Sequence, residues 1–387
     1  SYSGNVNFVL PPNGGTNGYF LTTDGSGNTS WAAASGGGGG LTSDSQFNTV
    51  GGTNAGDSFS GTNATNNTLI GYDAGTAITE GDNNSVLGYD AGQAITTGDK
   101  NTFMGASAGY STTTADKNVA IGSSALYSNT TGTENTVAGS SAGNQMSTGS
   151  YNSLYGRNAG NSITTASNNT FVGKDSGKSC TTGGNNVSMG WRSLEGLTTK
   201  THNTVIGYLA AYQADCFYVT AIGANVLEAT TGNPTGTVAI GYQAMLSGNV
   251  SGTYNVSVGA NSAEDLTSGA NNSFLGRYSG KNVTTGSDNT IIGDESGNTT
   301  TTGDNNIIIG HDAVASSATV DNEITLGDTN ITKFRIPGLN SFEINDSGQF
   351  SGVASTASGT AGVRVIYAST SSPSGGSDGD IWIKHAA

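Results

Sequence analysis

Charged residues, proline and long apolar runs are all scarce in this chain of 387 residues. Asp, Glu, Lys and Arg make up 11% of it, and there are only 5 Pro, 2 Cys and 3 Trp. Without a run of about 18 apolar residues, no segment is expected to insert into a membrane. The first ten residues, SYSGNVNFVL, lack the basic region and apolar core of a signal peptide. Low charge also argues against a disordered chain.

The few charges are mostly acidic. Against 28 acids there are 13 bases, which gives a net charge of −15. This balance disfavours binding to nucleic acid, which needs a basic face. The two cysteines, Cys180 and Cys216, lie about two repeats apart. Stacked repeats would place them roughly 10 Å from each other, so we expect unpaired thiols.

Glycine is abundant, with 61 copies, and it recurs at a fixed spacing. The pattern N-[TS]-x-x-G repeats about every 17 residues, for example from Asn67 to Gly71 and from Asn84 to Gly88. We number the Asn position 0 and the Gly position 4. Position-4 glycines occur at residues 52, 71, 88, 105, 122, 139, 156, 173, 190, 207, 223, 241, 259, 276, 293, 310 and 327. A fixed period of this kind is typical of a solenoid.

Positions 1 to 3 hold β-forming residues between Asn and Gly, so each repeat predicts one short strand. Frequent glycine and the absence of a 3.6-residue period exclude helix. Because side chains alternate along a strand, positions 1 and 3 share one face and position 2 has the other. We expect positions 1 and 3 to fill the interior of the coil, and position 2 to meet neighbouring chains.

The sequence therefore predicts an all-β fold, a parallel β-solenoid of about 17 coils with 17-residue repeats. Stacking at ~4.8 Å would give a rod of roughly 80 Å. Buried asparagines would form a ladder from coil to coil, and glycine at position 4 would provide either a positive φ or room for a close wall. The residues expected in this ladder include Asn67, Asn84, Asn101, Asn118, Gly71, Gly88, Gly105 and Gly122. So small a coil has a thin core, which favours a homotrimer.

The unit N-[TSV]-x-[ILV]-G-x-x-A resembles the head repeats of YadA-like trimeric adhesins, and Asn118 to Leu126, NVAIGSSAL, is the closest copy. The resemblance covers residues 48–327. It implies a trimer of left-handed parallel β-rolls.

The flanking segments resemble tail-fibre modules of tailed phages. They are Asn5 to Ala32, Ile331 to Gly338 and Ser371 to His385. We expect a β-module at residues 1–33 with Trp31 as a packing anchor, a Gly-rich joint at 34–47, the rod at 48–331, and a C-terminal β-module at 332–387. Candidate strands in this last module are Val363–Tyr367 and Asp380–Lys384. It would serve as a cap, a tip or a connector.

Two groups of side chains are candidate sites. Asp82, Asp99 and Asp116 share one position in three consecutive repeats. Stacking would bring these carboxylates within ~5 Å, and a Ca²⁺ ion would relieve their repulsion. The alternative is a solvated turn in which they splay apart. Asp73 and Asp90 form a similar pair. No other cofactor is expected.

The second candidate site follows position 5, which reads Arg157, Lys174, Trp191 and Tyr208 in successive repeats. Exposed aromatic rings beside cations could bind an acidic glycan, although a decorated solvent face is the alternative. The segment Leu209 to Gly223 breaks the period, which indicates either a lateral contact or simple drift of the repeat.

No pattern indicates catalysis. His202, His311 and His385 lie in no metal-ligand spacing, and neither a G-x-S-x-G elbow nor a P-loop occurs. We expect a structural and adhesive fibre of a phage virion, which joins other tail proteins and attaches to a host-surface glycan or protein. The alternatives are a bacterial YadA-like surface adhesin and, further off, a capsule depolymerase. An ice-binding solenoid would need an outward Thr array, which the expected orientation of position 1 disfavours.

Overall fold

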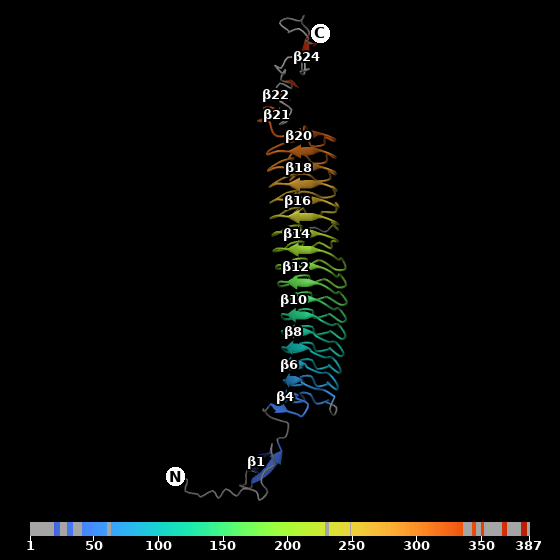
Figure 1. The fold of residues 1–387 in the computed structure, drawn as a ribbon, viewed down its shortest axis with the longest axis vertical. Helices are drawn as coiled ribbons and strands as arrows, with labels where there is room; N and C mark the ends of the chain where they lie inside the picture. The colour runs from blue at the N-terminus through green and yellow to red at the C-terminus, as the bar shows by residue number, and fades with distance from the viewer. Residues whose placement is uncertain are drawn as a thin grey trace, which may run out of the picture.

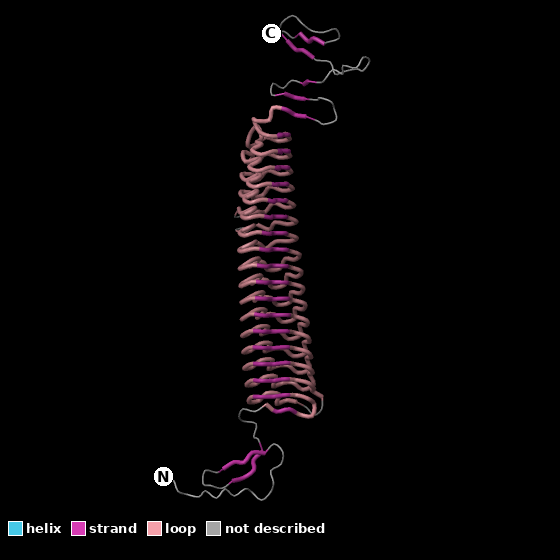
Figure 2. The backbone as a smooth tube through the Cα atoms, turned by 60° about the vertical axis from the view of Figure 1, so that its left-hand side comes forward, coloured by secondary structure: helices cyan, strands magenta, loops and turns pink. Residues whose placement is uncertain are grey.

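The computed structural model forms a straight column of stacked coils with small β-elements beyond its ends (Figure 1). It describes residues 19–23, 29–33, 41–59, 63–228, 232–247, 249–335, 343–345, 350–351, 366–369 and 381–384. Every coil contributes one short strand to the same side of the column, and turns make up the rest (Figure 2). The described residues contain no helix. The all-β solenoid expected from the repeat is confirmed.

Seventeen parallel strands, β4 to β20, form the ladder. Their bounds are β4 Thr49–Gly51, β5 Thr68–Ile70, β6 Ser85–Leu87, β7 Thr102–Met104, β8 Val119–Ile121, β9 Thr136–Ala138, β10 Ser153–Tyr155, β11 Thr170–Val172, β12 Val187–Met189, β13 Thr204–Ile206, β14 Thr220–Ile222, β15 Val238–Ile240, β16 Val256–Val258, β17 Ser273–Leu275, β18 Thr290–Ile292, β19 Ile307–Ile309 and β20 Ile324–Leu326. At the N-terminal end β3, Thr42–Ser43, pairs antiparallel with β4. The ladder does not close into a barrel, because β3 and β20 lie at opposite ends of the column.

Neighbouring strands pair strictly in register. Thr102 in β7 lies beside Val119 in β8, and Val119 lies beside Thr136 in β9. Backbone hydrogen bonds also join the turns of successive coils, as from Gly75 N–H to the Ala91 carbonyl at 3.0 Å. At position 12, threonine hydroxyls add a further row, such as Thr113 Oγ1 to the Thr130 carbonyl at 3.1 Å. Every side of the coil is therefore bonded to the next coil, although only three residues of it are strand.

The asparagines of position 0 lie inside the column and form the expected ladder. Asn84 is fully buried. Its N–H and its Nδ2 donate to Asn67 Oδ1 at 2.9 and 3.0 Å, and Nδ2 also donates to the Gly98 carbonyl at 2.9 Å. The side chain thus joins two coils and closes its own coil. Val219 and Thr237 interrupt the ladder, which resumes at Asn255 and continues to Asn306.

Glycine at position 4 is required on both of the grounds expected. Gly88 has φ 147°, which side chains disfavour, and a Cβ placed on it would lie 2.4 Å from the Gly105 carbonyl oxygen. No side chain fits between coils packed this closely.

The corners of the coil are formed by left-handed residues at positions 6, 8 and 16. In one coil these are Asp90 (φ 53°), Gly92 (φ 54°) and Lys100 (φ 59°). Asn, Asp and Gly reach this conformation at least cost, which explains why they crowd the turns.

The core consists of positions 2, 7, 8 and 11. In one coil these are Leu154, Ala159, Gly160 and Ile163, all buried. The expected orientation of the strand is therefore wrong: position 2 points inward, and positions 1 and 3 point outward. The reason is the alternation of the strand. Since the position-0 asparagine is buried, position 2 must share its side.

Core volume is shared between positions 2 and 8. In most coils a large residue at position 2 accompanies glycine at position 8, as a Cβ on Gly177 would lie 2.4 Å from the Phe171 ring. Val205 with Ala211 and Ile308 with Val314 are exceptions. In four coils where position 2 is small, position 8 is large and buried, whereas Ser257 is accompanied by Ala263. The first kind includes Leu69/Gly75, Val86/Gly92, Phe103/Gly109, Val137/Gly143, Leu154/Gly160, Phe171/Gly177, Phe274/Gly280 and Ile291/Gly297; the second includes Ala120/Leu126, Ser188/Leu194, Ala221/Leu227 and Ala239/Met245.

Short strands lie outside the column. β1 (Tyr19–Thr23) and β2 (Thr29–Ala33) form an antiparallel hairpin. After β20, the strands β21 (Lys333–Arg335), β22 (Glu343–Asn345) and β23 (Phe350–Ser351) form an antiparallel sheet, and β24 (Ile366–Ser369) pairs in parallel with β25 (Ile381–Lys384). The Gly-rich segment 35–40, His385, and the side chain of Trp31 lie outside what the structure describes.

Candidate functional site

The surface of the column is organised in rows, because each position recurs at the same place in successive coils. The strand face carries positions 1 and 3. No charged residue occupies either position from β4 to β20. Large apolar side chains stand half exposed along it, among them Leu87 at 44%, Ile121 at 42% and Leu275 at 51%. A long uncharged stripe on an acidic chain is a candidate contact surface.

Position 1 faces outward. An ice-binding face can therefore no longer be disfavoured on the ground that its threonines point inward. Thr68, Thr102 and Thr136 do point away from the core. The row is nevertheless irregular, since Val119, Val187 and Val238 interrupt it, and the bulky aliphatic residues of position 3 stand beside it.

The row at position 5 brings the candidate glycan-binding residues together. Trp191 and Tyr208 stack with ring centroids 5.1 Å apart and planes inclined by 22°. Lys174 Nζ lies 5.9 Å from the centre of the Trp191 ring. Arg157 is exposed one coil before Lys174. Similar rows of stacked rings occur elsewhere, as for Tyr72 with Tyr89 at 5.4 Å.

Two further residues, Arg192 and Tyr212, belong to this patch. They were not predicted from the sequence, because they occupy other positions of the repeat than position 5. The Arg192 guanidinium lies 5.3 Å from the centre of the Trp191 ring and 4.3 Å from that of Tyr212. It also bonds the carboxylate of Glu195 and the hydroxyl of Tyr212. The hydrogen bond with Glu195 raises the pKa of Arg192. These contacts hold the Arg192 guanidinium beside the aromatic row.

The carboxylates of Asp82, Asp99 and Asp116 do lie in successive coils, and each has a backbone partner. Asp82 Oδ1 accepts the Thr65 N–H at 2.7 Å, Asp99 Oδ1 accepts the Asp82 N–H at 2.7 Å, and Asp116 Oδ1 accepts the Asp99 N–H at 2.8 Å. Within the described ranges, no three His, Cys, Asp or Glu side chains are grouped to hold a metal ion. A calcium site here stays a prediction, which a melting curve with and without EDTA would check.

Asp73 and Asp90 lie at a left-handed corner. Asn54 Nδ2 donates to Asp73 Oδ1 at 2.8 Å. Desolvation, followed by the charge of Asp73, raises the pKa of Asp90.

The irregular segment Leu209 to Gly223 contains β14, which still pairs in register with the strands on either side of it. Its coil is one residue short, and Asn203 Nδ2 reaches the Cys216 carbonyl at 2.6 Å. Phe217 forms an isolated parallel bridge with Thr235, and Lys200 Nζ lies 4.5 Å from the centre of its ring. The bonds of this coil are regular up to Ala214, so the lost residue is absorbed between Ala214 and Cys216, in the turns that lead to the next strand.

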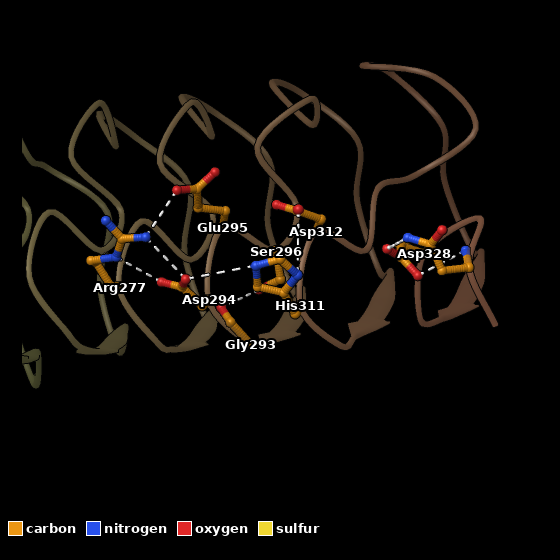
Figure 3. A network of polar contacts seen from close by, with 9 residues as sticks. Arg277, Gly293, Asp294, Glu295, Ser296, His311, Asp312 and Asp328 are labelled. Carbon is orange, nitrogen blue, oxygen red and sulfur yellow. Dashed lines mark hydrogen bonds and ion pairs between the residues drawn. The ribbon is translucent and has the colours of Figure 1, made fainter.

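Near the C-terminal end, position 5 becomes a charged row (Figure 3). Arg277 bonds Asp294 through Nε at 2.8 Å and Nη2 at 3.0 Å, and Nη2 also reaches Glu295 at 3.0 Å. The hydrogen bond from Arg277 lowers the pKa of Asp294. His311 lies between Asp294, at 3.9 Å, and Asp312, at 3.3 Å. Beside this row is a shallow hollow lined by Tyr278, Lys281, Asn282, Glu295 and Asn298.

Cys180 and Cys216 are free and buried, as the repeat spacing predicted. Burial raises the pKa of each thiol to about 12. A search of the described residues for a helix long and apolar enough to cross a bilayer finds none.

Comparison of the chain with protein-family models, with curated proteins and with solved structures finds no match in any of the three.

Proposed function

We propose that this chain forms the shaft of a trimeric fibre of a tailed-phage virion and contributes to attachment to the host surface. The observation that carries the proposal is the uncharged strand face, which follows the straight column from β4 to β20. Its half-exposed aliphatic side chains would be buried if three columns met along it. A rod that holds its apolar stripe at a three-fold axis leaves the position-5 flank free for a ligand.

The trimer thus uses the side of the strand opposite to the one expected from the sequence. Burial of positions 1 and 3 between chains adds apolar area in every coil, at roughly 25 cal/mol per Å². Three-fold symmetry also presents each flank three times, which raises avidity. The proposal includes no catalytic step and no membrane insertion. Further tail proteins would join at the small β-elements beyond the column.

A charged residue on the strand face tests the trimer. Ile121→Glu would place a carboxylate in the buried stripe, and Ser123→Glu would place one on the exposed flank of the same coil. Native mass spectrometry should report a trimer for the wild type and for Ser123→Glu, and dissociation for Ile121→Glu. A wild-type chain that stays a compact monomer contradicts the proposal.

Attachment is tested separately with the purified trimer. It should bind host cells and compete with virions for adsorption, and antibodies to it should label tail fibres in electron micrographs. Labelling of a bacterial envelope instead of virions would support the YadA-like adhesin and reject the phage fibre.

A further inference from the structure

One ring is missing from the aromatic row at position 5. The row runs Trp191, Tyr208, Ala224, Tyr242 in four successive coils. Tyr208 and Tyr242 are 51% and 53% exposed. Among the ring contacts of the described residues, Trp191 stacks on Tyr208, but none joins Tyr208 to Tyr242. The methyl group of Ala224 stands where the regular row would hold a side chain.

The backbone places Tyr208, Ala224 and Tyr242 directly above one another. Strands β13, β14 and β15 pair in register, Thr204 to Thr220 and Thr220 to Val238. Just after position 5, the Asn225 N–H donates to the Tyr208 carbonyl at 2.9 Å, and the Gln243 N–H donates to the Ala224 carbonyl at 3.0 Å. The irregular lengths of these coils therefore do not disturb the row.

The spacing of the coils sets the room at Ala224. Rings in adjacent coils stack at 5.1 Å in this row and at 5.4 Å for Tyr72 and Tyr89. Two coils span ~10 Å at the ordinary strand spacing. A ring placed midway would lie about 5 Å from each tyrosine, which is the distance the protein uses between its own rings.

The coils that lead to the opening from its N-terminal side carry charge of the sign opposite to that of the chain as a whole, whereas the coil of Ala224 itself carries one acid, Glu228, bonded by Asn225. On the flank that leads to it, four bases, Arg157, Lys174, Lys178 and Arg192, face two acids, Asp175 and Glu195. Both acids are paired: Lys174 Nζ lies 3.6 Å from Asp175, and Lys178 Nζ lies 3.8 Å from Glu195. Arg157 is exposed at the far end of the row. On a rod of net charge −15, this flank is where a polyanion can approach.

We propose that an anionic glycan binds this flank, with one sugar ring inserted over Ala224 between Tyr208 and Tyr242. The apolar faces of the ring stack on the two tyrosines, the glycosidic bonds leave from its edge toward solvent, and acidic groups of the adjoining units turn toward the N-terminal end to contact Arg157 and Lys174. This inference rests on the proposed adhesive function and names its ligand class.

Filling the opening with a protein ring tests the inference. Ala224→Trp should complete the aromatic row, since the same row already accepts Trp191, and it should abolish insertion. Binding is measured on immobilised polysaccharides that carry uronate, sulfate or sialate groups, with neutral dextran as the reference. The wild type should bind at least one anionic member and not dextran, and Ala224→Trp should weaken that binding by about tenfold or more.

The matched control is Ala106→Trp, which adds a ring at position 5 beside Tyr89, away from the cations, and should bind as the wild type does. Melting temperature and native mass should be unchanged in both Trp variants. Arg157→Gln with Lys174→Gln should weaken binding and flatten its salt dependence. Equal binding by Ala224→Trp, or a preference for dextran, overturns the inference. Binding to host cells that survives Ala224→Trp would reject this site and leave the adhesive function standing, whereas a wild type that binds neither cells nor glycans would reject both.

Discussion

The position-0 asparagine closes its coil by a hydrogen bond from its side chain to a backbone carbonyl at the end of the same coil. Asn135 is fully buried. Its Nδ2 donates to the Gly149 carbonyl at 2.9 Å, and its Oδ1 accepts the N–H and Nδ2 of Asn152 at 2.9 and 3.1 Å. A side chain of the same size without the amide would leave the Gly149 carbonyl and the Asn152 N–H buried without these partners, whereas Asn152 Nδ2 keeps its bond to the Ala166 carbonyl.

Asn135→Leu should therefore destabilise the protein by roughly 3 kcal/mol or more, because each buried polar group left unpaired costs ~1–3 kcal/mol. The measurement is the midpoint of urea unfolding. Asn144→Leu is the control. Asn144 is half buried and has a single bond, to the Ser124 carbonyl at 3.2 Å, so its loss should cost under about 1 kcal/mol. Equal losses would mean that the ladder adds nothing specific.

At the scale of the element, the coil is a unit with a fixed interior volume. Positions 2 and 8 share it, so the size of one restricts the other. Ala120 with Leu126 is one combination of side chains that fills this volume, and Leu154 with Gly160 is the other. In the first, Leu126 has φ 53°, a conformation that costs a leucine about 1 kcal/mol or more and is sustained by packing.

A double-mutant cycle tests this exchange. Ala120→Leu alone should overpack the coil, and Leu126→Gly alone should leave a cavity, each at a cost of ~2–4 kcal/mol. The double variant recreates the Leu154/Gly160 arrangement and should come within about 1 kcal/mol of the wild type in urea unfolding. Additive losses would show that the two sites do not share volume.

The last coil has a carboxylate at position 0 in place of the amide. Hydrogen bonds from the Ser316 hydroxyl, the Thr325 hydroxyl and the Ser316 N–H lower the pKa of Glu323. A depressed pKa in the folded state contributes stability above the unfolded value, ~4.3, and that stability is lost as pH falls through the folded value.

Acid should therefore loosen this end of the column first. Hydrogen exchange should show that protection at Ser316 falls between pH 6 and pH 3 more than protection at Asn135 in mid-column. In Glu323→Gln the same protection should be lower at pH 6 and nearly independent of pH. An unchanged Ser316 at pH 3 would rule out a role for this carboxylate.

The sequence was enough to predict the coil period, the single strand and the asparagine ladder, because each depends on residues repeated at one position. It misassigned the faces of the strand, since positions 2 and 3 are both apolar and hydrophobicity alone cannot rank them. The buried Asn67 could have decided the question by alternation, and so could the covariation of positions 2 and 8. The contacts of Arg192 and Tyr212 could not be predicted from the sequence, because they depend on the backbone conformation of a left-handed corner.

At the scale of the whole molecule, the column is a stack of interchangeable layers. Removal of residues 118–168 takes out three whole coils and places Asn169 on Asn101, with every row in register. The rod should shorten by ~14 Å and keep its melting temperature within a few degrees, as electron micrographs and thermal unfolding would show. Removal of residues 118–160 shifts the register and should abolish folding. If both deletions behave alike, the layers are not equivalent.

The hydrogen bonds between coils lie nearly parallel to the long axis, as the perpendicular strands in Figure 2 make plain. A force that pulls the two ends of one chain apart would consequently load these bonds in series, and the coils would peel away one by one from an end. Each 17-residue coil released would lengthen the tether by about 55 Å. A single chain held this way would act as an extensible spring under tension and would resist far better when squeezed.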